Sequence, residues 1–197
     1  MEFREVVRRR RMVRRFEDRA VPQDALERIL DAASRAPSAG FSQGQRVVVV
    51  TDRDMRRRLG ELCGESDEDE RWGRWVSTCG VQLVPCVSEN VYHRRYRETD
   101  KVDESGTEID WPVPYWWMDI GCTVENILLA AVDEGLGAGF AGTDREGWTQ
   151  AKALLGIPDE FAPVGVMPIG YPLPDVKSPS LERGKVPMSE FALRERW

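Results

Sequence analysis

The residues best suited to chemistry are arginines gathered at the start of the chain. Eight of the first twenty residues are arginine, and the run from Val6 to Phe16 places Arg10, Arg11 and Arg14 around Met12. A guanidinium group forms paired, charge-assisted hydrogen bonds with a phosphate or a carboxylate. The cluster therefore suits an anionic ligand, although a solvated surface charge is the alternative for each arginine taken alone.

Two further segments are suited to close contact with a flat or negatively charged ligand. The loop Pro37 to Arg46 is made mainly of small and polar residues, and Gly135 to Gly142 contains four glycines. Glycine lets a backbone approach another group closely. A tight helix-to-strand turn is the structural alternative for the second segment. Together with the arginines, these parts favour a planar anionic cofactor such as a flavin, whose own atoms carry out the chemistry.

Other catalytic systems are poorly represented. A nucleophilic triad needs a histidine, and the only one, His93, lies in no recognisable signature. The sequence has no GxxxxGK[ST] phosphate loop, and its glycines follow a predicted helix, whereas a Rossmann fingerprint opens one. Four cysteines without a CxxC pair predict no zinc site of ordinary spacing, so we expect no metal and mainly structural, reduced thiols.

Composition limits the class of protein. A length of 197 residues predicts one domain spanning residues 1–197, and a net charge of −6 with a pI near 5.1 argues against general nucleic-acid binding. The arginine-dense start lacks the apolar stretch of a signal peptide, and no segment is typical of a membrane span. We therefore expect a cytoplasmic protein without membrane contact.

A largely apolar helix from Met118 to Leu136 is predicted to be the spine of the fold. Its apolar side chains cover more than one face, and acidic residues and an asparagine interrupt them. The pattern predicts a core helix, or one that is buried against a partner chain.

Helices and strands are expected to alternate around this spine, as in an α+β or α/β fold. The patterns predict helices over residues 2–9, 22–36, 52–62, 72–78 and 144–155, and strands over 47–51, 81–88, 138–141 and 164–170. The valine run suggests a buried first strand, and Pro85 suggests that the second is an edge strand or bulged. The acidic residues between 61 and 70 are predicted to form a solvated turn.

Two segments have no clear periodicity. Residues 89–115 form a predicted irregular connection, and six aromatic residues lie between Tyr92 and Trp117. This composition favours a lid or pocket insertion over plain disorder. The C-terminal arm, residues 172–197, carries apolar side chains and is expected to pack on another element of this chain or of a second subunit.

The order of these segments resembles the FMN-dependent nitroreductase family. Residues 10–16 are similar to the family's N-terminal R-R-S-x-R-x-F, and residues 36–45 to A-P-S-x-x-N-x-Q-P-W. Residues 135–142 resemble its G-L-G segment, and residues 155–172 its L-G-I-P…P-V…G-Y-P ending. The resemblance covers nearly the whole chain. It implies an α+β nitroreductase-like fold, with a central, mostly antiparallel sheet wrapped by helices, in an intertwined homodimer with FMN at the interface.

The resemblance also implies which residues bind the cofactor. Arg10, Arg11 and Arg14 would contact the phosphate and pyrimidine edge of FMN, with Met12 contributing backbone only. The other expected contacts come from Pro37, Ser38, Ala39 and Gln43 of the second subunit, from backbone donors at Ala141, Gly142 and Thr143, and from Arg183 and Lys185 near the phosphate.

Three departures from the family pattern concern the substrate side: Met12 replaces Ser, Phe41 replaces Asn, and Gly44-Gln45 replaces Pro-Trp. Phe41, Trp111 and Tyr115 are the expected substrate-pocket residues. The implied activity is electron or hydride transfer from NAD(P)H through FMN to a small, aromatic or nitroaromatic acceptor by a ping-pong mechanism, with no catalytic side chain named. The alternatives are a flavin-fragmenting, dehalogenating or dehydrogenating family member, or a flavin-binding protein without fast turnover.

Overall fold

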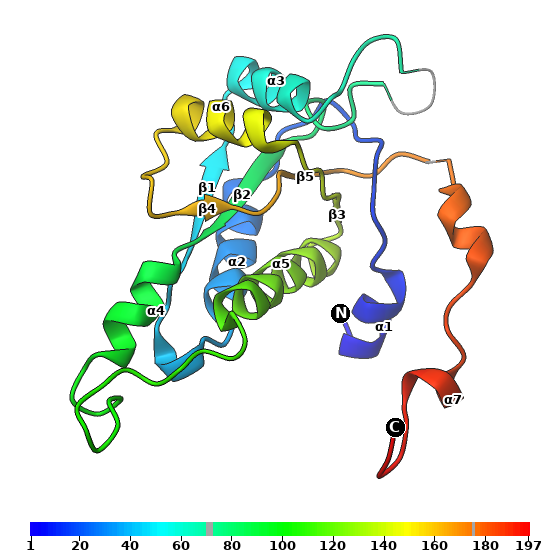
Figure 1. Ribbon diagram of the computed structural model, residues 1–197. Coiled ribbons are helices and arrows are strands. Elements are labelled where there is room, and N and C mark those ends of the chain that lie inside the picture. The colour runs from blue at the N-terminus through cyan, green and yellow to red at the C-terminus, as the bar shows by residue number, and fades with distance from the viewer. Residues whose placement is uncertain (70–72, 175) are drawn as a thin grey trace.

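The computed structural model describes residues 1–69, 73–174 and 176–197 and has helices on both faces of a sheet (Figure 1). The helices are α1 Phe3–Arg9, α2 Gln23–Ser34, α3 Arg53–Leu62, α4 Glu89–Tyr96, α5 Tyr115–Asp133, α6 Arg145–Leu155 and α7 Met188–Phe191, with 3-10 turns η1 Ala39–Phe41 and η2 Pro179–Arg183. The strands are β1 Gln45–Val50, β2 Val81–Val87, β3 Gly137–Ala138, β4 Ala162–Pro163 and β5 Met167–Gly170.

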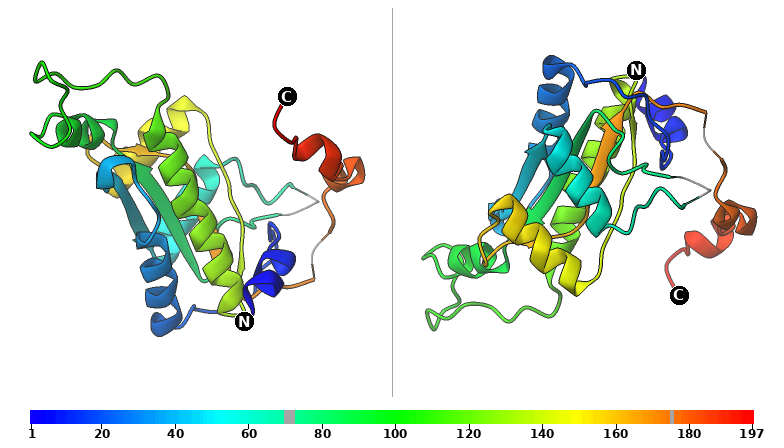
Figure 2. Two further views of the ribbon diagram at one scale, coloured as in Figure 1. Left: turned by 90° about the horizontal axis from the view of Figure 1, so that it is seen from below. Right: turned by 90° about the horizontal axis from the view of Figure 1, so that it is seen from above.

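The five named strands pair antiparallel, with strand order β1-β2-β5-β3 and with β4 paired to β2, and one isolated parallel bridge joins Met12 to Ala138 of β3. Helices α2 and α5 pack on one face, and α3 and α6 pack on the other (Figures 1 and 2). Strand β2 contributes side chains to the cores on both faces of the sheet, because successive side chains of a strand point to opposite faces. Leu83 belongs to the core beneath α2 and α5, whereas Val84 belongs to the core beneath α3 and α6. The predicted α+β class and mostly antiparallel sheet are confirmed.

Local signals explain several helix ends. Asp52 accepts a hydrogen bond from Met55 N at 2.8 Å at the start of α3, and Asp144 accepts one from Gly147 N at 2.8 Å at the start of α6. Gly156 ends α6 in the left-handed conformation, with φ of 64°. These contacts satisfy backbone groups that a helix leaves unpaired at its ends.

The positions of the first two strands differ from those expected. The valine run forms β1, an edge strand whose Val49 is 39% exposed and in which only Val50 is buried. Strand β2 lies at the centre despite Pro85, so the edge alternative of the prediction is wrong; the bulge alternative is closer, since the register on the β4–β5 side shifts by one residue between Leu83 and Cys86. Proline is tolerated because the pairing of β2 with β5 ends at Leu83 and its pairing with β4 begins at Cys86.

Three connecting segments also differ from their predictions. Residues 89–96 form α4, so the irregular connection is limited to residues 97–114. Residues 73–78 form turns instead of a helix, and Trp72 lies outside the described residues. The strand predicted over 138–141 is reduced to β3 and an isolated bridge between Ala141 and Val166.

The acidic run is solvated only in part. Glu65 is buried, and its carboxylate accepts hydrogen bonds from Val76 N at 2.8 Å, Ser77 N at 3.0 Å and the Ser77 hydroxyl. Glu65 therefore fixes the turns that precede β2. Glu70, at the end of the run, lies outside the described residues.

The spine helix α5 is buried on one face only. Ile127, Leu128 and Ala131 pack into the core with the sheet, while Met118 is 57% exposed and Cys122 is also exposed. No helix in the described parts of the chain is both long enough and apolar enough to cross a membrane.

Among the described residues, the C-terminal arm packs on the rest of the chain only at its start, where Leu173 N donates to Arg15 O at 3.0 Å. Residues 176–197 are exposed or nearly so, and η2 and α7 stand away from the layers in each view (Figures 1 and 2). Its large apolar side chains are exposed, including Leu181, Met188, Phe191 and Trp197. The apolar surface of the arm is therefore available for contact with another protein chain.

We expect Glu65→Gln to lower the free energy of unfolding by about 2 kcal/mol, because Val76 N–H and Ser77 N–H would then bond a neutral amide oxygen in place of a carboxylate. Urea unfolding followed by circular dichroism at fixed protein concentration measures this change. Glu68→Gln, an exposed change in the same run, is the control and should cost less than about 0.5 kcal/mol. Equal losses in the two variants would contradict the role of Glu65.

Candidate functional site

The loop 37–43 is held in an unusual backbone shape by long-range hydrogen bonds. Gly40, Phe41 and Gln43 have positive φ values of 59°, 56° and 53°. The Asp119 carboxylate on α5 accepts the Ala39 N–H at 2.8 Å, although only 9% of Asp119 is exposed. The Phe41 side chain, in contrast, is 75% exposed. The loop is thus fixed by internal and long-range hydrogen bonds, while the Phe41 and Gln43 side chains are exposed.

Helix α4 holds the same loop from a second side. Arg95 Nε donates to Gly40 O at 3.0 Å, and a Cβ atom placed on Gly40 would lie 2.5 Å from the Tyr96 ring. The Arg95 guanidinium also forms two bonds of 2.6 Å with Asp100, and it lowers the pKa of Asp100 to about 2. Arg95 therefore joins the loop 37–43 to the irregular segment 97–114.

The segment 97–114 is attached to α4 through Glu108. The Glu108 carboxylate accepts from Trp111 Nε1 at 2.7 Å and from Arg97 Nε at 2.8 Å, and it contacts His93 Nδ1. The hydrogen bond to Glu108 raises the pKa of His93. Trp111 lies among rings, with its centroid 4.4 Å from that of Tyr96. Of the three expected substrate-pocket residues, Trp111 is thus packed against neighbours, whereas Phe41 and Tyr115 are exposed.

The arginine arm, residues 10–14, runs beside strand β3. Val13 N donates to Ala138 O at 2.9 Å, and the Arg14 guanidinium lies 5.6 Å from the centre of the Trp75 ring. Arg10 Nε lies 3.8 Å from Glu125 Oε1 on α5. Arg11 borders a hollow of about 370 Å³, and Met12 is exposed. The arm therefore presents basic side chains next to the glycine-rich turn.

Two backbone donors in the turn Ala141–Thr143 have no acceptor in the described parts of the chain. Ala141 N donates to Val166 O at 2.8 Å, so this N–H, which the sequence suggested for the flavin, is already used. Gly142 N and Thr143 N have no acceptor among the residues that the structure describes. The Thr143 hydroxyl donates to Leu62 O, which fixes the turn against α3. The turn offers two neighbouring N–H groups instead of three.

A single chain does not bring all of the expected cofactor residues together. The loop 37–43 contacts α5 at Asp119 and the arginine arm contacts it at Glu125, six residues or about 9 Å further along the helix axis. Arg183 and Lys185 lie on the exposed arm, away from both (Figure 1).

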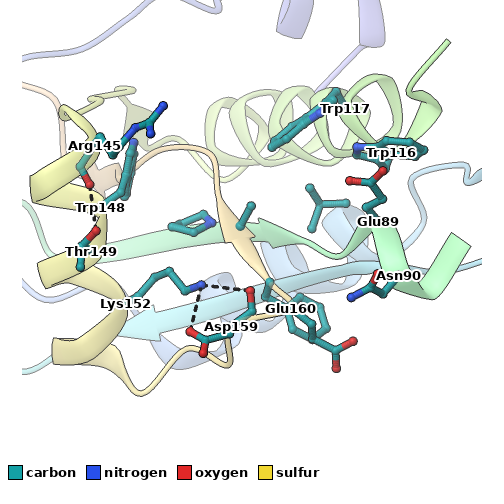
Figure 3. Close-up of a pocket in the computed structure, with 14 residues that line it drawn as sticks. Glu89, Asn90, Trp116, Trp117, Arg145, Trp148, Thr149, Lys152, Asp159 and Glu160 are labelled. Carbon is teal, nitrogen blue, oxygen red and sulfur yellow. Dashed lines mark hydrogen bonds and ion pairs between the residues drawn. The ribbon is translucent and has the colours of Figure 1, made fainter. Parts of the chain in front are cut away.

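A hollow of about 680 Å³ was not anticipated by the sequence (Figure 3). It lies between the start of α5 and one face of α6, and its floor is formed by β4 and the end of β2. Its lining includes Trp116 and Trp117 on α5, Arg145, Trp148 and Lys152 on α6, and Glu89, Asp159, Glu160 and Phe161. A signal was present, because Arg145, Trp148 and Lys152 follow helical spacing, but the pattern alone does not say which face is open.

Comparison with known proteins identifies the fold and the family. Residues 7–171 match the profile of the nitroreductase family. The chain belongs to the nitroreductase family. It is 30% identical over 177 residues to a protein of Methanothermobacter thermautotrophicus that is provisionally named NADH dehydrogenase/NAD(P)H nitroreductase, covering 87% of this chain and 78% of the relative.

Solved structures of this family share the architecture. NfrA1 of B. megaterium superposes with a TM-score of 0.79 at 21% identity, over 100% of this chain and 75% of that one. The NADPH:FMN oxidoreductase of Vibrio harveyi, solved with NAD⁺, superposes with a TM-score of 0.74 at 25% identity, over 99% and 77% of the chains. The expected nitroreductase fold is confirmed, and the chain is an enzyme of this family.

In this nitroreductase-family enzyme, we expect Asp119→Leu to loosen the loop 37–43, since the acceptor for Ala39 N–H is lost. A hydrogen bond to a carboxylate contributes about 1.5 kcal/mol, so amide exchange of residue 39 should speed up about tenfold. Hydrogen–deuterium exchange measures this rate. Asp119→Asn keeps an acceptor oxygen and should restore most of the protection. Glu125→Leu, on an exposed position of the same helix, is the control, and an equal effect there would contradict the prediction.

Proposed function

We propose that this enzyme uses FMN to pass electrons or hydride from NAD(P)H to a small aromatic or nitroaromatic acceptor by a ping-pong mechanism. The observation that carries the proposal is the pair of free N–H groups at Gly142 and Thr143, which follow the strand beside the arginine arm. Two neighbouring backbone donors suit the nitrogen and carbonyl edge of a flavin ring.

The relatives support this choice of cofactor and donor. The Vibrio harveyi protein is by its name an NADPH:FMN oxidoreductase, and its structure contains NAD⁺. The Methanothermobacter relative is also named for NADH or NAD(P)H activity. A nicotinamide donor and an FMN cofactor are therefore the natural assignment for this chain.

The basic residues fit the phosphate of FMN. Arg10, Arg11 and Arg14 would hold the phosphate and the pyrimidine edge, and Met12 would contribute only its main chain. A bidentate guanidinium contact suits a phosphate better than a point charge does. When bound, FMN would supply the redox chemistry at its ring. The arginines would bind the phosphate of the cofactor, and the N–H groups of Gly142 and Thr143 would fix the edge of its ring. The reacting face of the ring would stay accessible to one small molecule at a time.

The loop 37–43 and the turn 141–143 would act on the two sides of one cofactor from different subunits. Pro37, Ser38, Ala39 and Gln43 would line the ring from the partner, while Gly142 and Thr143 donate from the first chain. Asp119 holds this loop through a bond that is shielded from water, so the ring would meet a preformed surface. This arrangement would explain why the loop 37–43 contacts α5 at Asp119 while the arginine arm of the same chain contacts it at Glu125.

We also propose that residues 97–114 form a lid and govern the choice of acceptor together with Phe41, Trp111 and Tyr115. Arg95 links the segment to the loop 37–43 through Asp100 and Gly40 O. A movement of the lid would thus be transmitted to the loop 37–43 through the hydrogen bonds of Arg95.

A homodimer would explain the two uncovered apolar surfaces. Met118, Gly121 and Cys122 form an exposed stripe on α5, and nothing lies within 4 Å of a Cβ atom placed on Gly121. A second helix could therefore approach closely there. The arm 176–197 would then cover apolar surface on the partner and bring Arg183 and Lys185 to the partner's cofactor phosphate.

The cofactor assignment predicts that the double variant Arg10→Ala, Arg14→Ala binds FMN about 3 kcal/mol more weakly, because charge-assisted bonds to a phosphate are lost. Fluorescence titration of the FMN-free protein with FMN measures the affinity. Arg8→Ala, which removes an exposed arginine paired with Glu5, is the matched control. Unchanged FMN affinity in the double variant would overturn the assignment.

The dimer assignment predicts that Met118→Glu shifts the protein toward monomer, since an unpaired carboxylate would be buried between two α5 helices at a cost of roughly 3 kcal/mol. Sedimentation velocity over a dilution series measures the shift. Val49→Glu places the same charge on the exposed edge strand and should leave the dimer intact. A wild-type protein that sediments as a folded monomer when dilute would exclude the assignment.

A further inference from the structure

The hollow between α5 and α6 combines aromatic walls with an uneven distribution of charge. Trp116 and Trp117 stand on the α5 side, and Trp148 and Arg145 stand on the α6 side (Figure 3). On the α5 side, Trp117 is 48% exposed and Trp116 is buried, with 7% of its surface exposed. A volume of about 680 Å³ lies within the range of small-molecule sites. The walls therefore suit a flat ring system of modest size.

Two of the three acidic residues of the lining, Glu160 and Asp159, lie beside a permanent cation, and Glu89 lies beside a histidine. Glu160 Oε2 lies 3.0 Å from Arg94 Nη1, and Glu89 Oε1 lies 3.3 Å from His93 Nε2. Asp159 is engaged by Lys152, which donates to the Asp159 carbonyl at 3.1 Å (Figure 3). Arg94 and Lys152 therefore compensate the negative charges of Glu160 and Asp159.

Arg145 differs from the other charged residues of the lining. No carboxylate lies within ion-pair distance of its guanidinium in the described parts of the chain, and the side chain is exposed. Neither the Trp117 nor the Trp148 indole N–H has an acceptor among the described residues. Arg145 is thus an unmatched cation, and the Trp117 and Trp148 indole N–H groups are neutral donors in the same lining; all three favour an acceptor with a negative charge.

We propose that this hollow binds a planar aromatic carboxylate, with its ring against Trp117 and Trp148 and its carboxylate on Arg145. A single unpaired guanidinium matches a singly charged carboxylate in charge and in its forked geometry. A phosphate would carry up to two charges, and the second cation, Lys152, is already engaged by Asp159.

The site also has a connection to the redox centre. Arg145 is the first residue of α6 and follows Thr143 by two positions, so the wall of the hollow continues from the turn with the two free N–H groups. That the aromatic acid is an electron acceptor of the enzyme rests on the proposed function. Binding of the acid does not rest on it.

Isothermal titration calorimetry of the purified protein with 2-naphthoate, and with the uncharged 2-naphthamide, tests the binding site. Saturable binding of the acid is expected, and Arg145→Gln should weaken it about tenfold while leaving the amide nearly unaffected. Trp117→Leu should weaken both ligands, because it removes ring contact from each. Arg58→Gln, which removes an exposed arginine of α3 outside the lining, is the matched control.

Absence of saturable 2-naphthoate binding overturns the site, as does an Arg145→Gln effect no larger than that of Arg58→Gln. A parallel assay compares NADPH-driven reduction of 4-nitrobenzoate with that of 4-nitrobenzamide. A KM for the acid that rises only in Arg145→Gln supports its role as acceptor. Binding without turnover of either compound retains the site and counts against the proposed function, whereas equal turnover of both without binding retains the function and rejects the site.

Discussion

Helix α5 packs against the sheet with one face, and its other side contacts the loop 37–43 and the arginine arm. The arrangement of most of the candidate site follows from this constraint. Ile127 and Leu128 are buried against the sheet, so the rotation of the helix about its axis is fixed. Once it is fixed, Asp119 faces the loop 37–43 and Glu125 faces the arginine arm. Met118 is left outside. The same packing that closes the core thus determines where the two parts of the proposed cofactor site can lie.

The central strand β2 extends this constraint to the other layer. Because Leu83 and Val84 point to opposite faces, β2 couples the core under α5 to the core under α6. The turns before β2 are held by Glu65, whose buried carboxylate accepts three hydrogen bonds. Helix α6 is thereby placed so that its N-terminal turn lies next to the Gly142–Thr143 donors and its exposed side faces the tryptophans of α5.

Ion pairs and charged hydrogen bonds in this protein mainly hold the loop 37–43 and the segment 97–114 in place, whereas apolar packing forms the core. Arg95 holds Gly40 O and Asp100 together, and Glu108 gathers His93, Arg97 and Trp111. These contacts join loops that have little core of their own. Exposed ion pairs contribute little to stability in isolation, but a network with a buried or forked partner fixes geometry. The result is a connected shell around the loop that we assign to the partner's flavin.

The sequence by itself determined features whose causes lie within a few residues. The caps at Asp52 and Asp144, the left-handed end at Gly156 and the apolar spacing of α5 are local, and so their helices could be predicted. The order of four family motifs was enough to indicate the fold and the type of enzyme, because it reflects the whole chain.

The tertiary structure alone decided everything that depends on which distant groups meet. Pro85 is tolerated in a central strand because β5 and β4 pair with different parts of β2, a fact that no local pattern contains. Glu65 is buried because backbone donors reach it, and the Ala141 N–H is unavailable because Val166 accepts it. Arg145 becomes a candidate anchor for the same reason, since a charge is unmatched only when all of its neighbours in space are known.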